Sequence, residues 1–148
     1  MIDLTKLLAE WQIDCAIDPN HLDESSRTTP MLHAKYLTHL AECKLALKQS
    51  EFKQKQLLKD KWLYYSGRMC QDDIETRNWK PDPFDGLKIL KSDYEYYYES
   101  DPELIESEAK IQYLKTTIDT LKEIVDNLKW RHQTLGNMIR WRQFESGM

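Results

Sequence analysis

Glycine and proline are scarce in this chain of 148 residues, with four and five copies respectively. Because these residues form most tight turns and interrupt helices, their scarcity predicts long regular elements. It also leaves no glycine-rich loop for a phosphate, and the patterns GxGxxG and GxxxxGK[ST] are absent. The hydrolase pattern GxSxG and the zinc pattern HExxH are absent as well. We therefore expect no enzyme, no catalytic residue and no cofactor.

Cysteine and long apolar runs are limited too. The three cysteines are far apart in the sequence and form no CxxC pattern; they are Cys15, Cys43 and Cys70. This pattern indicates a reducing compartment rather than a disulfide framework. No histidine lies at metal-ligand spacing from a cysteine, so we predict no metal site. No apolar run approaches the roughly 18 residues of a membrane span. The length predicts one domain, over residues 1–148, with a real core.

Apolar residues spaced by three and four indicate a mainly α protein with long helices. A first helix is predicted over residues 2–13. A second, of about 35 residues, is predicted from Thr29 and Pro30, a capping residue and a proline suited to the first turn. Gly67 suits a left-handed residue ending it. Its buried side is expected to contain Leu37, Leu40, Leu47, Leu57, Leu58 and Trp62.

The rest of the chain is predicted to be an irregular part over residues 69–100 and one long helix over residues 101–145. Aromatic enrichment favours short strands near residues 86–99, although the pattern also fits a short helix. Asp101, Pro102 and Glu103 form a strong helix start. The coiled-coil-like apolar seam that follows is too long for one small domain to cover alone. It must pack against the other long helix, another subunit, or both.

Charge is distributed unevenly, although the net charge is only −4. Seven basic and two acidic residues lie between Lys44 and Arg68, whereas twelve acidic and four basic residues lie between Gln71 and Glu108. Lysines in the basic stretch share roughly one helix face, and aromatic residues follow them. Lysine neutralises phosphates, and aromatic rings stack on unpaired bases. The alternatives are a solvated lysine face and core positions for Trp62 and Tyr65.

The block from Leu58 to Arg68, LKDKWLYYSGR, resembles the basic-aromatic motif LKxRLxYYSGR of the UvsY recombination mediators of T-even-like phages. Lys61 replaces the arginine of that motif, which keeps the charge but loses the bidentate fork. The segments 31–37 and 142–147 resemble the MLYSKWL and RAFEAG stretches of the same family, and other segments resemble its cyanophage-type members. The part of the protein implied to bind DNA is residues 1–68. Its predicted contacts are Lys48, Lys55, Lys59, Lys61, Tyr64, Tyr65 and Arg68.

The resemblance implies a DNA recombination, repair and replication protein that binds single-stranded DNA in the cytoplasm of an infected bacterium. Its implied partners are a phage RecA-like recombinase and a phage single-strand-binding protein. It also implies a ring of six or seven identical subunits, for which the seam is the natural surface. The predicted oligomerisation residues are Ile111, Leu114, Ile118, Leu121, Val125, Leu128, Leu135 and Ile139. A structural coiled-coil adaptor without DNA binding is the alternative.

Overall fold

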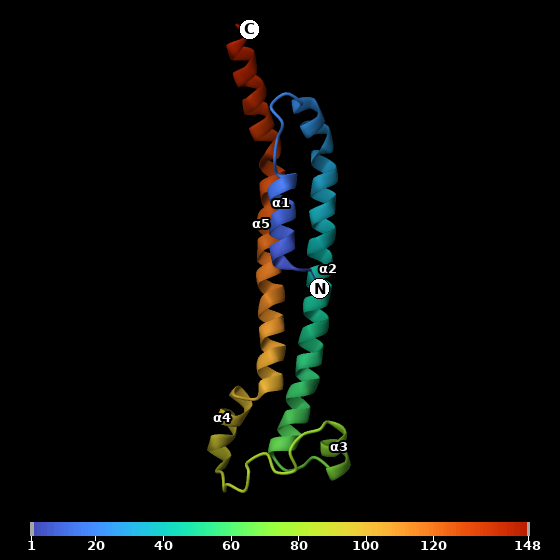
Figure 1. Ribbon diagram of the computed structural model, residues 1–148, viewed down its shortest axis with the longest axis vertical. Coiled ribbons are helices and arrows are strands. Elements are labelled where there is room, and N and C mark those ends of the chain that lie inside the picture. The colour runs from blue at the N-terminus through green and yellow to red at the C-terminus, as the bar shows by residue number, and fades with distance from the viewer. Residues whose placement is uncertain (1, 148) are drawn as a thin grey trace. The chain divides into compact units, whose positions relative to one another are not determined.

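The computed structural model describes residues 2–147, which form helices joined by connections, the longest of them over residues 77–90 (Figure 1). Within these residues no strand is found, and the mainly α prediction is confirmed. Two compact units are formed. The first unit contains residues up to Ala46 and from Leu114 onward, and the second contains Leu47–Tyr113. The elements are α1 (Leu4–Asp14), α2 (Leu22–Tyr65), α3 (Gln71–Thr76), the 3-10 turn η1 (Lys91–Asp93), α4 (Tyr94–Glu99) and α5 (Pro102–Glu145).

The first unit is built by α1, the beginning of α2 and most of α5 (Figure 1). Its core combines Leu7 of α1 and Tyr36 of α2 with the apolar seam of α5. The rings of Trp11 and Tyr36 meet edge to face at 5.3 Å between centroids. Buried Arg131 donates to the carbonyl oxygens that follow α1, at 3.2 and 3.4 Å. Apolar packing and these hydrogen bonds together hold α1 against the two longer helices.

The second unit contains an aromatic cluster at the end of α2. Tyr64 and Tyr65 are buried there together with Ile74 of α3. Partly buried side chains from the irregular connection and from α4 pack against them, and these are Met69, Trp79, Phe84, Tyr97 and Tyr98. Aromatic rings offer large apolar area and favourable edge contacts, so this cluster orders a segment that has little regular structure.

Three helix ends have recognisable capping residues, and two of them, at Asp101 and Gly67, were predicted from the sequence. Asp3 caps α1 by accepting hydrogen bonds from the backbone N–H groups of Thr5 and Lys6. Asp101 accepts from the N–H groups of Glu103 and Leu104, which confirms the predicted start of α5. Gly67 has a φ of 73°, the left-handed conformation expected of a helix-ending glycine.

The predicted start of α2 at Thr29 and Pro30 is wrong, because the helix begins at Leu22 and continues through Pro30. An interior proline costs about 3 kcal/mol in a helix. Burial of Leu22 and two acidic residues in the first turn oppose that cost. The hydroxyl of Thr29 also bonds back to the carbonyl oxygen of Ser25 at 2.8 Å. The start of α2 is therefore determined by packing upstream of Thr29 and not by the local capping signal.

The strands favoured near residues 86–99 are also wrong, because the described chain forms η1 and α4 there. A strand needs a partner for its backbone groups, and none is present in the described residues. Tyr94, Tyr97 and Tyr98 have helical spacing and contact Phe84 or Tyr65, whereas Tyr96 is exposed. The tyrosine spacing, rather than the aromatic content, was the informative signal.

The buried side predicted for α2 is mostly wrong. Leu40 is buried, but Leu37, Leu58 and Trp62 are exposed. Leu47 and Leu57 are half-buried. At the end of α2 the aromatic cluster covers the face that contains Lys61, Tyr64 and Tyr65, and the opposite face is therefore left to solvent.

Candidate nucleic-acid interface

The seven residues predicted to bind DNA divide between two faces of the chain around α2. Each helical residue turns the side chain by about 100°, so Lys59 and Lys61 point about 200° apart. Lys59 is exposed, whereas Lys61 is only 3% exposed. The buried face contains Lys61, Tyr64 and Tyr65, and the exposed residues are Lys48, Lys55, Lys59 and Arg68.

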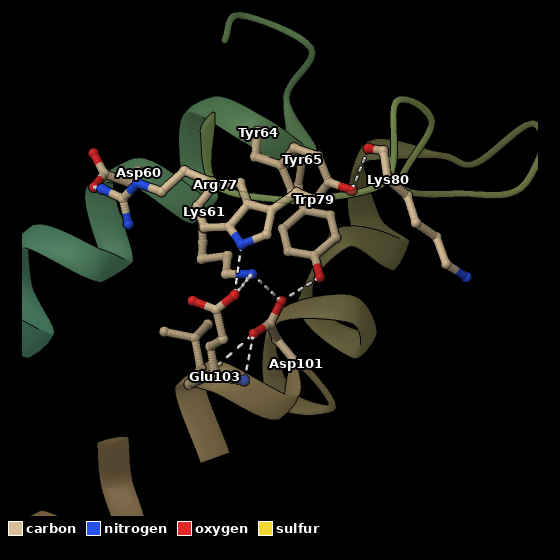
Figure 2. A network of polar contacts seen from close by, with 10 residues as sticks. Asp60, Lys61, Tyr64, Tyr65, Arg77, Trp79, Lys80, Asp101 and Glu103 are labelled. Carbon is tan, nitrogen blue, oxygen red and sulfur yellow. Dashed lines mark hydrogen bonds and ion pairs between the residues drawn. The ribbon is translucent and has the colours of Figure 1, made fainter. Parts of the chain in front are cut away.

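Lys61 belongs to a polar network with the start of α5 (Figure 2). Its Nζ lies 3.0 Å from Oδ2 of Asp101 and 3.5 Å from Oε1 of Glu103. The Tyr65 hydroxyl donates to the same Asp101 oxygen at 2.5 Å. Burial would raise the pKa of Asp101, but the hydrogen bonds from Tyr65, Lys61 and Leu104 outweigh it and hold that pKa below its usual value. Asp101 therefore stays ionised and compensates the charge of Lys61.

Trp79 extends this network into the irregular connection (Figure 2). Its ring centroid lies 3.9 Å from Nζ of Lys61, a close cation–π contact, and its Nε1 donates to Glu103 at 2.5 Å. Arg77 lies over the same ring at 5.2 Å and pairs with Asp60 of α2. These contacts attach the chain after α3 to both long helices within the second unit.

The hydroxyls of the two motif tyrosines are engaged as well. Tyr64 donates to the carbonyl oxygen of Lys80 at 2.7 Å, and Tyr65 donates to Asp101. Burial raises the pKa of both tyrosines, so both remain protonated donors. The structure thus corrects the sequence-based picture: Lys61, Tyr64 and Tyr65 lie inside the unit, where they support the end of α2 rather than form its surface.

The exposed face of α2 has the charge that the prediction required. Lys48 pairs with Glu51 at 3.3 Å; the lysine side chain is exposed, and that of Glu51 is half-buried. In the described part of the chain, no carboxylate forms an ion pair with Lys55, Lys59 or Arg68. Three cations without carboxylate partners can each neutralise a phosphate and release its counterion.

Sequence reasoning missed two sets of residues. Asp101, Glu103 and Trp79 were not connected with Lys61, although the spacing of 61, 64 and 65 already placed those three on one helix face. Phe52 was not considered as a DNA contact, and Trp62 was weighed between base stacking and a core position but was left out of the predicted contacts. Both are exposed on the same side of α2 as Lys59. Their spacing from the lysines could have revealed this.

The predicted oligomerisation seam packs within the chain. Seven of its eight residues are at most 6% exposed, and only Ile139 reaches 42%. Of the partners predicted for the seam, the structure therefore shows the chain's own helices. The seam as a whole is not exposed for contact with another subunit. The large apolar side chains of α5 that remain exposed are Ile105 near its start and, toward its end, Trp130, Ile139, Trp141 and Phe144.

Two kinds of site were also searched for directly. Among residues 2–147, no group of three or more His, Cys, Asp or Glu side chains could hold a metal ion. None of the helices in this range combines the length and apolar character of a membrane span.

The fold and the exposed face define a class of long-helix proteins with lysines exposed along one helix face. The family described as "Recombination, repair and ssDNA binding protein UvsY" matches residues 10–148. The chain belongs to this family, whose members act in recombination and repair and bind single-stranded DNA. No curated protein matches the chain.

Solved structures agree on the fold. Crystal structures of the bacteriophage T4 recombination mediator protein UvsY are similar to this chain in several lattices. In lattice type II the identity is 24%, the TM-score is 0.79, and 99% of each chain is covered. In lattice type IV the identity is 22% and the TM-score 0.78, with 97% of this chain and 99% of the other covered. The arrangement of helices is therefore shared although most side chains differ.

Proposed function

We propose that this protein is a recombination mediator that binds single-stranded DNA on the exposed face of α2. It loads the phage RecA-like recombinase onto DNA covered by single-strand-binding protein. The processes served are homologous recombination, repair and recombination-dependent replication. The observation that supports this site is the set of exposed cations without carboxylate partners, Lys55, Lys59 and Arg68. The setting is the cytoplasm of the infected bacterium.

The cations of one protomer neutralise few phosphates, so a single copy binds weakly. A ring of six or seven copies raises the effective concentration of the remaining sites once one is occupied. Side chains near the end of α5, such as Ile139, Trp141 and Phe144, are exposed and apolar, which suits a subunit contact better than the buried seam. Wrapping the strand over several copies would weaken the grip of the single-strand-binding protein and present DNA to the recombinase.

The test is a titration of a fluorescent oligonucleotide at several salt concentrations. We expect wild-type affinity to fall steeply with salt. For Lys55→Ala with Lys59→Ala, the slope of log K against log salt should decrease by about 1.4 for each protomer that contacts the strand, since each single-strand phosphate contact contributes about 0.7. The matched control is Lys122→Ala with Lys129→Ala, two exposed lysines of α5. We expect the control slope to equal that of the wild type.

Two results would count against this proposal. Absence of wild-type binding at every salt concentration would favour the coiled-coil adaptor, which has no reason to bind DNA. An unchanged slope in the Lys55 and Lys59 variant would move the DNA to another surface. Particle mass measured in parallel by light scattering separates loss of DNA contacts from loss of assembly.

A further inference from the structure

The exposed face of α2 contains aromatic residues that alternate with its lysines along the helix. Phe52 follows Lys48 by four residues, Lys55 and Lys59 come three and seven residues later, and Trp62 lies three beyond Lys59. Spacings of three and four keep side chains on one helix face. Phe52 is 59% exposed and Trp62 46% exposed, so both rings are open to solvent in the protomer.

Each ring lies next to a cation. Nζ of Lys55 is 5.9 Å from the centre of the Phe52 ring, and Cζ of Arg68 is 5.0 Å from the centre of the Trp62 ring. Both distances fall within the range of cation–π contacts, about 6 Å. Arg68 reaches Trp62 because the chain turns back at Gly67, whose φ of 73° ends the helix. The turn therefore places a guanidinium at an aromatic surface.

We propose that Trp62 and Phe52 are stacking platforms for unpaired bases, with Arg68 and Lys55 contacting the adjacent phosphates. This inference rests on the proposed function and adds its base-contacting residues. The two rings lie about 15 Å apart along the helix axis, at 1.5 Å per residue, so one strand following the face passes both. Trp62 is the stronger platform, because its ring is larger and its cation is an arginine, which also stacks.

Charge and ring placement together favour this occupant. A protein helix docking on an apolar stripe would meet cations between the rings, and the nearby acid Glu51 is paired with Lys48. A single strand offers both complements, phosphates for the cations and a π-face on every base for the rings. The tyrosines of the same segment cannot serve, because Tyr64 and Tyr65 are buried and engaged in hydrogen bonds.

The test compares an ordinary oligonucleotide with an abasic strand of the same length. Trp62→Ala should weaken binding of the ordinary strand about 5- to 150-fold, the range of base–aromatic stacking. It should leave binding of the abasic strand and the salt slope unchanged, because no phosphate contact is lost. Trp62→Phe should restore most of the affinity. The control is Tyr96→Ala, a 71% exposed tyrosine of α4 in the same unit, which should behave as wild type.

A fluorescence measurement keeps the inference testable if Trp62→Ala folds poorly. The difference in emission between wild type and Trp62→Phe isolates the Trp62 signal, which should be quenched by the ordinary strand and not by the abasic one. Equal losses on both strands, or no quenching by the ordinary strand, would overturn the stacking role. If wild type binds neither strand, the proposed function itself fails.

Discussion

An aspartate that accepts hydrogen bonds from one lysine and one tyrosine occurs in both units. The Asp14 cluster is Asp14, Lys35 and Tyr36, and the Asp101 cluster is Asp101, Lys61 and Tyr65. The lysine nitrogen lies 2.6 Å from the carboxylate in the first cluster and 3.0 Å in the second. The tyrosine hydroxyl donates at 2.8 Å and 2.5 Å respectively. The chemical groups are thus the same.

Burial separates the two clusters. The side chains of Lys61 and Asp101 are 4% and 2% exposed, whereas those of Lys35 and Asp14 are 35% and 19% exposed. In both, burial opposes ionisation of the aspartate, and the lysine and tyrosine hydrogen bonds still hold its pKa below the usual value. Water can replace a lost partner only in the Asp14 cluster. Loss of the lysine or the tyrosine should therefore be tolerated in the Asp14 cluster and should be strongly destabilising in the Asp101 cluster.

The largest expected effect is that of Lys61→Ala. Removal of the ammonium leaves the Asp101 carboxylate buried without its cation, and breaking one side of a buried pair costs about 3–5 kcal/mol. We expect a loss of this size in the free energy of unfolding, measured by urea denaturation. Near-UV circular dichroism should report loosening of the aromatic cluster at the same time.

Lys59→Ala is the matched control for Lys61→Ala, two residues away on the exposed face. Its effect on the free energy of unfolding should stay within about 0.5 kcal/mol, as for most surface substitutions. At temperatures where both variants are folded, Lys59→Ala should weaken DNA binding more than Lys61→Ala does. A stable Lys61→Ala protein with weakened DNA binding would show that Lys61 leaves its buried position to contact DNA.

An intermediate effect is expected when each cluster loses its tyrosine hydroxyl. Tyr65→Phe removes a hydrogen bond to a carboxylate that water cannot reach, and such bonds contribute about 1.5–3 kcal/mol. Tyr36→Phe should cost less, at most about 1.5 kcal/mol, because the partly exposed Asp14 can recruit a water molecule. Thermal or urea unfolding of both variants measures the difference. Equal losses would mean that burial of the carboxylate does not decide the outcome.

Sequence reasoning predicted the elements better than their faces. Helical spacing and the Asp101–Glu103 start located α5, and Gly67 located the end of α2. The faces of α2 depend on what covers them, and near its end the covering segment is residues 66–100, which contain α3, η1, α4 and the irregular chain between them. Its position comes from aromatic and polar contacts between residues far apart in the chain, such as Tyr65 with Asp101. A pattern within one helix contains no information about those partners.

The candidate site shows the same limit. Lysine and tyrosine content indicated nucleic acid, and the family match agrees with that indication. Helix geometry alone could have separated Lys59 from Lys61, because residues two apart point to nearly opposite sides. Helix geometry could not have shown which of these two lysines is exposed to solvent. Trp62 shows this best, since a large aromatic residue is usually interior, yet here it lies beside Arg68 at the surface.

The smallest expected effect is that of Lys35→Ala, the counterpart of Lys61→Ala in the Asp14 cluster. Lys35 pairs with both Glu10 and Asp14, but its side chain is 35% exposed. Pairs open to solvent contribute about 0.2–1 kcal/mol and are screened by salt. We expect a loss of about 1 kcal/mol or less in the free energy of unfolding at low salt, shrinking further in 1 M salt. The penalty for Lys61→Ala should change little over the same salt range, because its pair is dry. A salt-insensitive loss of several kcal/mol for Lys35→Ala would mean that the two clusters are equally closed to water.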